Sequence, residues 1–423
     1  MNKRGLMTGI VAVRLLAASN LASVAAGGAQ EWTRFRGENG SGVALTANTP
    51  ASFTDKEVNW KIDLPGIGHS SPVVYGNKIF LTCGDTKTAT RYLMCVDLET
   101  GKTLWKKEYT SHWFRQHDYN SFASASPVVD AEHVYFTFIV PESYMVRCVD
   151  HNGNELWTYD MGRWQSQHGC GCSPILFEDL LIVPNDQDGP TASLVALDKT
   201  TGSERWRIKR KSGNTAASTP CLYQPKDGPA QLILTSSASG ITSIDPRTGK
   251  QNWELEKAMK FRSVGSPIAT DSLVVGTCGE GGKNRACVVV KPGQGDTPPK
   301  VLYTMPTGAN YPYVPSPVIK GDDMFLWSDI GTVTCVKVAT GKQVWQQSAR
   351  KEGTKEEFFS SPIIAGDKLY NISKDGDLIC LEAGETFKEL GRTPLNDKCY
   401  ATPAVAGNRL IIRTASKLMS VGT

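Results

Sequence analysis

Short apolar runs recur along most of the chain, separated by turns of glycine and polar residues. The run at residues 72–75 is followed by Gly76 and Asn77, and then by a second run at residues 78–81. Runs of this length, bounded by such turns, are typical of β-strands rather than helices. The pattern therefore predicts an all-β chain of short antiparallel strands joined by tight turns.

A Ser-Pro or Thr-Pro step stands before the first apolar run of each unit. The steps begin at Ser71, Ser126, Ser173, Thr219, Ser266, Ser316, Ser361 and Thr402. Successive prolines lie 55, 47, 46, 47, 50, 45 and 41 residues apart. A period of roughly 40–50 residues in a β-rich chain predicts a propeller with one four-stranded blade per repeat. Proline lacks an N–H and is tolerated at an edge, so we expect each step on the innermost strand, facing the channel.

A tryptophan marks the fourth apolar run of most repeats, after a turn that contains glycine. Glycine allows the positive φ of this turn, and tryptophan covers a large apolar area where one blade meets the next. Tyr303 lies near this position in the fifth repeat, and the seventh repeat has no tryptophan there. The predicted structural tryptophans are Trp60, Trp105, Trp157, Trp206, Trp253 and Trp345.

The last repeat is too short to contain its fourth strand, because only 20 residues follow Pro403. Residues 58–64, which include Trp60, read as an isolated fourth strand before the first repeat. We therefore predict an eight-bladed β-propeller of four-stranded antiparallel blades, spanning residues 58–423. The N-terminal strand at residues 58–64 completes the last blade, because a closed ring leaves few exposed sheet edges.

The N-terminal region has two expected parts. Residues 1–29 have the basic start, short apolar stretch and small-residue cleavage site of a secretory signal peptide, which predicts a periplasmic or extracellular protein. Residues 30–57 form a glycine-containing lead-in that we expect to lie across the ring, without recognisable chemistry. No other stretch is apolar enough for a membrane helix, and the first cysteine is Cys83, so no lipoprotein cysteine is expected. The net charge of +4 is interspersed and gives no case for nucleic acid binding.

The eleven cysteines offer three interpretations. One repeat position carries Cys95, Cys148, Cys335 and Cys380 and is occupied elsewhere by alanine or serine, which indicates a small buried packing site. Disulfides Cys83–Cys95 and Cys278–Cys287 could join successive strands, and the sequence leaves this question open because it does not give the distances between the cysteines. His168, Cys170 and Cys172 alternate with glycine, but their spacing is not that of a zinc site, so packing or a disulfide is favoured and no metal is expected.

The segments that precede the Ser/Thr-Pro steps should emerge on one face, around the mouth of the channel. Their polar and aromatic residues could bind a ligand there, although ordinary polar loops would look the same. No Ser/His/Asp set or pair of carboxylates stands out, so we assign no catalytic residue. The candidate ligand-binding residues are His69, Tyr119, Asn120, His168, Asn214, Arg262, Tyr311, Tyr313 and Tyr400.

The repeat resembles that of the pyrroloquinoline quinone (PQQ) repeat family, with the best matches at 97–105, 198–206, 245–253 and 339–345. This resemblance implies the eight-bladed fold and one of two functional branches. Quinoprotein dehydrogenases oxidise alcohols or sugars with PQQ and Ca²⁺, and commonly stack PQQ on a disulfide between adjacent cysteines. The other branch resembles BamB, a scaffold of outer-membrane protein assembly that binds proteins without a cofactor.

The sequence departs from both branches. It has no adjacent cysteines and no recognisable calcium set with a catalytic Asp, and it lacks the anchoring cysteine usual in BamB. We expect a monomeric binding or scaffold module with protein partners and no cofactor, rather than an enzyme. The alternatives are a PQQ- and calcium-dependent alcohol or sugar dehydrogenase, and an enzyme with another cofactor at the channel mouth.

Overall fold

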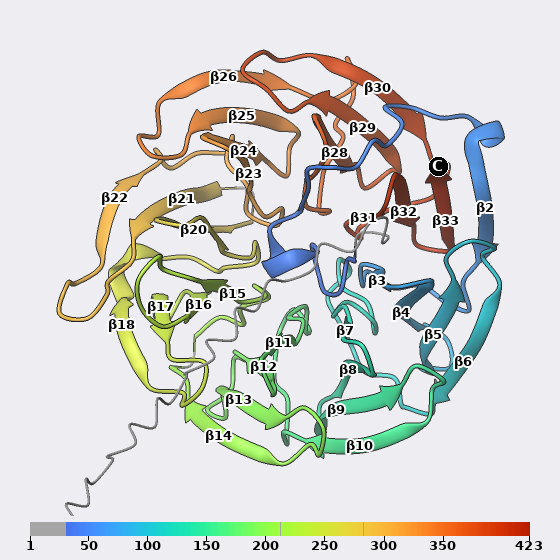
Figure 1. Cartoon of the computed structure of the whole chain (residues 1–423), viewed down its shortest axis with the longest axis horizontal. Coiled ribbons are helices and arrows are strands. Elements are labelled where there is room, and N and C mark those ends of the chain that lie inside the picture. The colour runs from blue at the N-terminus through green and yellow to red at the C-terminus, as the bar shows by residue number, and fades with distance from the viewer. Residues whose placement is uncertain (1–30, 212, 282) are drawn as a thin grey trace, which may run out of the picture.

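A computed structural model describes residues 31–211, 213–281 and 283–423, and these form an eight-bladed β-propeller (Figure 1). Helical structure in these ranges is limited to three short 3-10 turns, η1 (Glu38–Gly40), η2 (Asp55–Glu57) and η3 (Glu256–Ala258). None of the helices in the described ranges has the length and hydropathy to span a bilayer. The predicted signal peptide at residues 1–29 lies outside the described residues.

The first four blades follow one another in sequence, and within each the strands run from the channel outward in chain order (Figure 1). Their strands are β3 (Val73–Tyr75), β4 (Lys78–Gly84), β5 (Arg91–Asp97) and β6 (Thr103–Tyr109); β7 (Val128–Val129), β8 (His133–Val140), β9 (Ser143–Asp150) and β10 (Glu155–Asp160); β11 (Ile175–Phe177), β12 (Leu180–Asn185), β13 (Ser193–Asp198) and β14 (Glu204–Lys209); and β15 (Cys221–Tyr223), β16 (Gln231–Ser236), β17 (Gly240–Ile244) and β18 (Gln251–Leu255).

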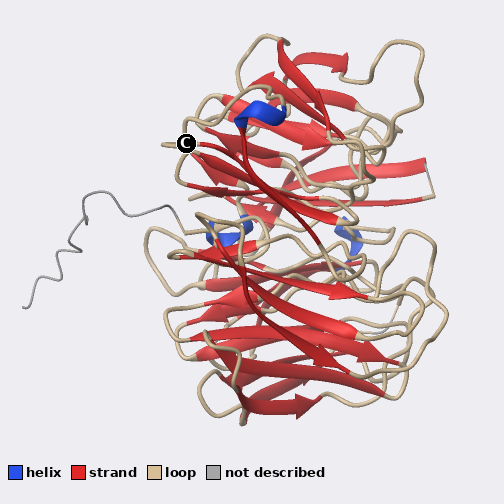
Figure 2. Ribbon diagram, turned by 90° about the vertical axis from the view of Figure 1, so that its right-hand side faces the viewer, coloured by secondary structure: helices blue, strands red, loops and turns tan. Residues whose placement is uncertain are grey.

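The remaining blades repeat this arrangement, and the side view in Figure 2 shows the strands stacked around the ring. Their strands are β19 (Ile268–Ala269), β20 (Val274–Glu280), β21 (Lys283–Lys291) and β22 (Lys300–Thr304); β23 (Val318–Lys320), β24 (Asp323–Trp327), β25 (Thr332–Lys337) and β26 (Gln343–Ser348); β27 (Ile363–Ala365), β28 (Lys368–Ile372), β29 (Asp377–Glu382) and β30 (Glu389–Pro394); and β31 (Ala404–Ala406), β32 (Arg409–Arg413) and β33 (Lys417–Gly422) with β2 (Val58–Asp63).

The ring closes as predicted, because the N-terminal strand completes the eighth blade. Strand β2 pairs antiparallel with β33, with Val58 opposite Val421 and Asp63 opposite Lys417. A further short strand, β1 (Val43–Ala44), pairs in parallel with β27 on the inner edge of blade seven. Backbone hydrogen bonds thus join the first strand of the ring to its last strand, more than 350 residues later in the sequence.

The Ser/Thr-Pro steps form a closed ring of hydrogen bonds around the channel. In each step the backbone N–H of the Ser or Thr donates to the side-chain hydroxyl of the Ser or Thr in the next blade, and Thr402 donates to Ser71. The eight donor–acceptor distances lie between 2.8 and 3.1 Å. The hydroxyl therefore joins neighbouring blades, while the proline that follows needs no partner for a backbone N–H.

The predicted tryptophans lie between blades, and most of them bond to the turn of the next blade. The indole N–H donates to a turn carbonyl for Trp60, Trp105, Trp157, Trp206 and Trp345, at 2.8–3.1 Å. The ring also packs on the turn glycine, so that a Cβ added at Gly101 would lie 2.5 Å from the Trp60 ring. Trp253 differs, because its indole donates to Gln231 within its own blade.

In the two repeats without tryptophan, other groups occupy the tryptophan position between neighbouring blades. In blade five, the Tyr303 hydroxyl donates to the Val338 carbonyl at 2.6 Å, and its ring packs on Gly341 of the next turn. In blade seven, the backbone of Ala51 in the lead-in approaches Gly391 so closely that a Cβ there would lie 2.7 Å from the Ala51 carbonyl oxygen. Tyrosine and the lead-in thus fill the positions of the absent tryptophans.

The lead-in plugs the centre of the ring, where it appears as the blue segment in Figure 1. Buried Arg34 donates to the Pro220 carbonyl at 2.6 Å, and buried Arg36 donates to Pro317 at 2.7 Å and Pro362 at 3.2 Å. These three carbonyls belong to the Ser/Thr-Pro steps of blades four, six and seven. The lead-in thus lies across the ring as predicted, but its two arginines also bind the inner strands, which the sequence analysis missed.

All eleven cysteines lie in the described residues, and all are free thiols. The shared position of Cys95, Cys148, Cys335 and Cys380 is fully buried, as the packing interpretation predicts. The two disulfides left open from sequence are excluded by the pleat of the sheets. Cys83 and Cys95 belong to apolar clusters on different faces of blade one, and Cys278 and Cys287 are separated in the same way in blade five.

Candidate functional site

A cavity of about 510 Å³ occupies the channel mouth on the face where the inner strands begin. Its size lies in the range of sites that bind small molecules or inserted side chains. Phe35 of the lead-in lines it together with ring residues such as Ser266 and Ser361. Because Arg34 and Arg36, on either side of Phe35, bind the inner strands, the lead-in turns an open channel into a cavity with a floor.

One position of the repeat supplies the inner wall of this cavity. The residue two before the Ser or Thr of each step lines the cavity in all eight blades. In blades two to six it is small or β-branched, whereas in blades seven, eight and one it is aromatic. The eight residues are His69, Ser124, Gly171, Ala217, Val264, Val314, Phe359 and Tyr400.

The aromatic residues of this wall continue into an arc of six rings, which we call the aromatic arc. Neighbouring ring centroids lie 4.5–5.9 Å apart, and the two end pairs, His69–Tyr400 and His117–His168, are stacked. The Lys374 ammonium lies 4.1 Å from the centroid of the Tyr119 ring, within the range of a cation–π contact. In order, the arc comprises His69, Tyr400, Phe359, Tyr119, His117 and His168.

Charged residues lie on the other side of the cavity, on blades five and six. Arg262 and Arg285 both line it and are nearly buried. Arg285 lies 3.7 Å from Asp329, which also accepts the backbone N–H groups of Tyr313 and Val314 at 2.8 and 3.2 Å. Burial raises the pKa of Asp329 despite this arginine. The cavity thus has an apolar, aromatic half and a polar, charged half.

The two end histidines of the arc are uncharged at neutral pH. Burial and the nearby Arg413 guanidinium lower the pKa of His69 to about 3. Burial, Arg262 and His117 lower the pKa of His168 to about 4. Neutral imidazoles can stack on flat groups and exchange hydrogen bonds, but they add no positive charge to the site.

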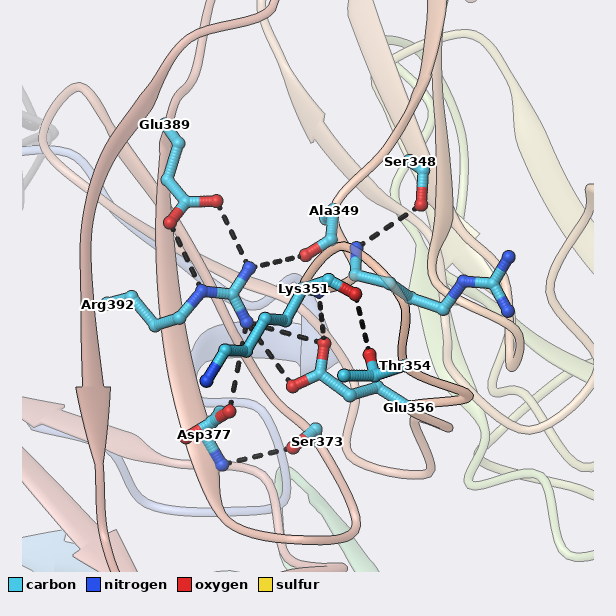
Figure 3. A network of polar contacts seen from close by, with 10 residues as sticks. Ser348, Ala349, Lys351, Thr354, Glu356, Ser373, Asp377, Glu389 and Arg392 are labelled. Atoms are coloured by element: carbon cyan, nitrogen blue, oxygen red, sulfur yellow. Dashed lines mark hydrogen bonds and ion pairs between the residues drawn. The ribbon is translucent and has the colours of Figure 1, made fainter.

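The loop that carries Phe359 is held by the network in Figure 3. Arg392 on β30 donates to the Ala349 carbonyl at 2.6 Å and makes ion pairs with Glu356 and Glu389 at 3.3 and 3.1 Å. Glu356 also accepts the backbone N–H of Lys351 at 2.7 Å. Because both ends of the loop are fixed in this way, Phe359 is presented to the cavity from a braced backbone.

Seven of the nine candidate residues from the sequence analysis line the cavity. Tyr311 does not, because it is buried in the apolar core between blades five and six. Asn214 is exposed and does not line the cavity. The seven that do are His69, Tyr119, Asn120, His168, Arg262, Tyr313 and Tyr400.

Other residues also line the cavity that were not among the candidates, including His117, Arg285, Asp329, Glu357 and Phe359. Phe359 had a clear signal, since it stands at the same offset from its step as His69 and Tyr400. Arg285 and Asp329 had none, because they lie in or directly after second and third strands. The side chains of Arg285 and Asp329 reach the channel because of the geometry of their blades, and their positions in the repeat do not indicate this.

The residues present do not fit a calcium-bound PQQ. Glu357 is paired with Lys374 at 2.5 Å, Asp329 is engaged by two backbone N–H groups, and Asn120 donates to the His168 carbonyl at 2.5 Å. Across the described ranges, no group of three His, Cys, Asp or Glu side chains is arranged to hold a metal ion. The Cys172 thiol donates to the Ser218 carbonyl at 2.9 Å and is buried, so no sulfur pair is presented to a flat quinone.

Comparison with known proteins places this geometry in a family. Residues 142–325 and 329–421 match the family model described as outer membrane protein assembly factor BamB. The chain belongs to the BamB family. The resemblance to PQQ-repeat propellers inferred from the blade motif is thereby confirmed. No curated protein matches the sequence.

Solved structures with the same fold include both branches expected from the sequence. BamB from Moraxella catarrhalis is 13% identical, with a TM-score of 0.58 over 86% of this chain and 97% of that chain. Quinohemoprotein alcohol dehydrogenase from Comamonas testosteroni is 12% identical, with a TM-score of 0.64 over 93% of this chain and 80% of that chain. The computationally designed Ika8 protein is also similar, at 12% identity and a TM-score of 0.61, over 85% of this chain and 98% of that chain. At these identities, the likeness shows that this BamB-family chain has the same fold as the three structures. It does not show that the chain shares an activity with any of them.

Proposed function

We propose that this protein is a binding module of the periplasm or the extracellular space, which holds a segment of a partner protein at the channel mouth and works without PQQ. Membership of the BamB family supports a scaffold role. The aromatic arc is the observation that carries the proposal. Rigid aromatic side chains provide large contact areas at low entropic cost and dominate the energetics of many protein interfaces.

The loop between β6 and β7 favours a macromolecular partner over a small molecule. It contributes His117 and Tyr119 to the arc and also carries Trp113, whose side chain is 62% exposed. Tyr119 itself is 49% exposed. Aromatic surface therefore extends beyond the cavity. Because Phe35 floors the cavity, a bound segment inserts side chains rather than threading through the ring.

Site-specific photocrosslinking in the native cells tests this surface. A photoreactive residue replaces Trp113 or Tyr119, and the matched controls replace Leu104 on β6 or Leu156 on β10. These leucines are 44% and 47% exposed on the outermost strands, where a partner could instead add a strand to the sheet edge. We expect a discrete crosslinked partner from the loop positions and none from the outer strands. The reverse pattern would refute the proposed surface.

Calorimetric titration with PQQ and Ca²⁺, followed by a dye-linked alcohol and sugar oxidation screen, tests the alternative. We expect no heat of binding, because the cavity carboxylates are already engaged by Lys374 and by backbone N–H groups. Tight binding with turnover would replace the scaffold proposal by a quinoprotein dehydrogenase.

A further inference from the structure

The charges that line the cavity balance one another. Among the described residues, its lining includes two cations and two anions, which are Arg262, Arg285, Asp329 and Glu357. Arg285 lies 3.7 Å from Asp329. The charges of Arg262 and Asp188 attract each other. A charged ligand would therefore lose its hydration and find no unpaired counter-charge in the cavity.

Ionisable groups at the edge of the cavity add no free charge to it. His69 and His168 are uncharged at neutral pH, because burial, as the largest effect, lowers their pKa values to about 3 and about 4. Buried Arg36 and Arg413 donate to backbone carbonyls and do not line the cavity. The lining is thus neutral as a whole, and the aromatic arc forms its apolar half.

One cation lies against the aromatic arc from outside the cavity. The Lys374 ammonium is 4.1 Å from the centroid of the Tyr119 ring and 4.7 Å from that of the Phe359 ring. An ion pair with Glu357 at 2.5 Å holds this ammonium, and both rings line the cavity whereas Lys374 does not. The ammonium draws electron density of the two rings away from the cavity, so a ligand cation gains less from them. Another uncharged ring does not compete with the ammonium.

We propose that the aromatic arc receives an uncharged aromatic side chain of the partner, such as phenylalanine or tyrosine, and that Lys374 excludes cationic side chains from it. This inference rests on the proposed binding function and adds the chemistry of the group that is inserted. The arc contains stacked and edge-to-face pairs, with interplanar angles of 25° for His69–Tyr400 and 88° for Tyr119–Phe359. An inserted ring can adopt both favoured arrangements with these neighbours.

Capped pentapeptides that differ only at their central residue test the preference for a ring. The full chain is titrated with the phenylalanine peptide and with the cyclohexylalanine peptide, which keeps the size of the side chain but removes its aromaticity. We expect phenylalanine to bind about 2–10-fold more tightly, the equivalent of about 0.5–1.5 kcal/mol for an aromatic pair. Ligand-observed NMR measures these affinities, because it detects weak complexes.

Two further peptide pairs test the preference for an uncharged group. The cationic 4-aminomethylphenylalanine is compared with 4-hydroxymethylphenylalanine, and the anionic 4-carboxyphenylalanine with 4-carbamoylphenylalanine. In each pair the size is nearly constant and the charge changes. We expect the uncharged member of each pair to bind more tightly, because the charges of the cavity are already compensated.

An aromatic ring could also come from a free small molecule, and a third comparison distinguishes this source. The full chain is titrated with p-cresol and with 4-methylcyclohexanol, which form a matched pair without a peptide backbone. A preference for the ring in the peptide series supports a side chain of a partner protein. A preference in the p-cresol pair alone overturns the assignment to a partner side chain.

Substitution of one ring assigns the preference to the arc. Phe359→Leu keeps an apolar side chain but removes the ring, so the ratio between the phenylalanine and cyclohexylalanine peptides should move toward one. Phe177→Leu is the matched control, because the Phe177 ring also lies beneath a cation, Arg247 at 5.2 Å, but does not line the cavity. Circular dichroism verifies folding, and Tyr119→Leu, at a position that is 49% exposed, replaces Phe359→Leu if that variant unfolds.

A double variant tests the role of Lys374. Lys374→Met combined with Glu357→Gln removes both charges of the ion pair at once and leaves the charge balance of the cavity unchanged. Discrimination against the aminomethyl peptide should fall by about 2–5-fold, the equivalent of about 0.5–1 kcal/mol for a cation–π contact. Unchanged discrimination would overturn the role of Lys374.

The proposal as a whole is overturned by equal or tighter binding of the cyclohexylalanine peptide, by a charged peptide that binds more tightly than its uncharged match, by a preference that survives in folded Phe359→Leu, or by the absence of saturable binding of the phenylalanine peptide. Its failure is separable from that of the proposed function. A partner crosslinked at Trp113 without any preference for the ring removes only the aromatic assignment. A preference that depends on Phe359, without any crosslinked partner, removes only the protein-binding role.

Discussion

Removal of one hydroxyl from the ring of Ser/Thr-Pro steps should measurably destabilise the propeller. Ser173 is suited to this test because it is 2% exposed and does not line the cavity. Its hydroxyl accepts the backbone N–H of Ser126 at 2.9 Å. In Ser173→Ala this buried N–H loses its partner, and nothing else in the step changes.

The expected magnitude follows from the cost of an unsatisfied buried donor. Such a group lowers the free energy of unfolding by about 1–3 kcal/mol. The entropy of unfolding of a ring of this size is about 0.8 kcal/mol/K, so the melting temperature should fall by about 1–4 °C. Ser173→Thr should be close to neutral, because Thr219 and Thr402 already serve at the same position of the repeat.

Thermal and urea unfolding monitored by circular dichroism measure both variants against wild type. Ser272→Ala is the surface control, since Ser272 lies in an exposed turn, and we expect a change within about 0.5 kcal/mol. If Ser173→Ala is as stable as Ser173→Thr, the hydroxyls do not hold the blades together and the reasoning is refuted.

Three further changes test other parts of the structure. Trp206→Phe removes the indole donor to the Pro246 carbonyl and should lower the free energy of unfolding by about 1–3 kcal/mol in urea titrations; an unchanged midpoint would contradict this role. The pKa of His69 is lowered from 6.5 to about 3, so between these pH values the unfolded chain binds a proton that the folded chain does not. Its contribution to stability is complete above pH 6.5 and is lost as pH falls toward 3, so stability in His69→Gln should depend less on pH in this window; parallel pH profiles would refute this. Arg392→Gln should increase hydrogen exchange in residues 349–360 and weaken ligand binding at Phe359, and unchanged exchange would show that the network does not brace the loop.

The fold could be predicted because the repeat is marked by particular side chains at regular spacing. Each blade carries its own copy of the proline step, and most carry the tryptophan, so eight copies reinforce one interpretation. The ring of hydrogen bonds between the Ser/Thr-Pro steps was harder to predict from the sequence. Each acceptor is a side-chain hydroxyl, but each donor is a backbone N–H in another blade. The same limit applies to Arg34 and Arg36, whose partners are the carbonyls of Pro220, Pro317 and Pro362. Every residue type has the same backbone carbonyl, so contacts to these groups produce no pattern of residue types in the sequence.

The candidate site was predictable only in part, for a related reason. Residues that precede the steps share one offset, and this offset places His69 and Tyr400 correctly and could have found Phe359. Tyr311 stands in the same kind of segment, yet it is buried between blades. The direction of a side chain in a loop depends on backbone turns that the repeat does not specify. At the position two before each Ser/Thr-Pro step, in contrast, the strand that follows fixes the direction of the side chain.

The closure of the ring by β2 and the plug by the lead-in impose an order on folding. The strand at Val58–Asp63 is synthesised first, but its partner β33 (Lys417–Gly422) is synthesised last. Arg36 likewise needs carbonyls from blades six and seven before it is satisfied. Closing so long a loop is slow, because its entropy is lost before its contacts are gained. The first strand of the ring to be synthesised is therefore the last to find its partner, and a growing chain must keep this strand unpaired until β33 has been synthesised.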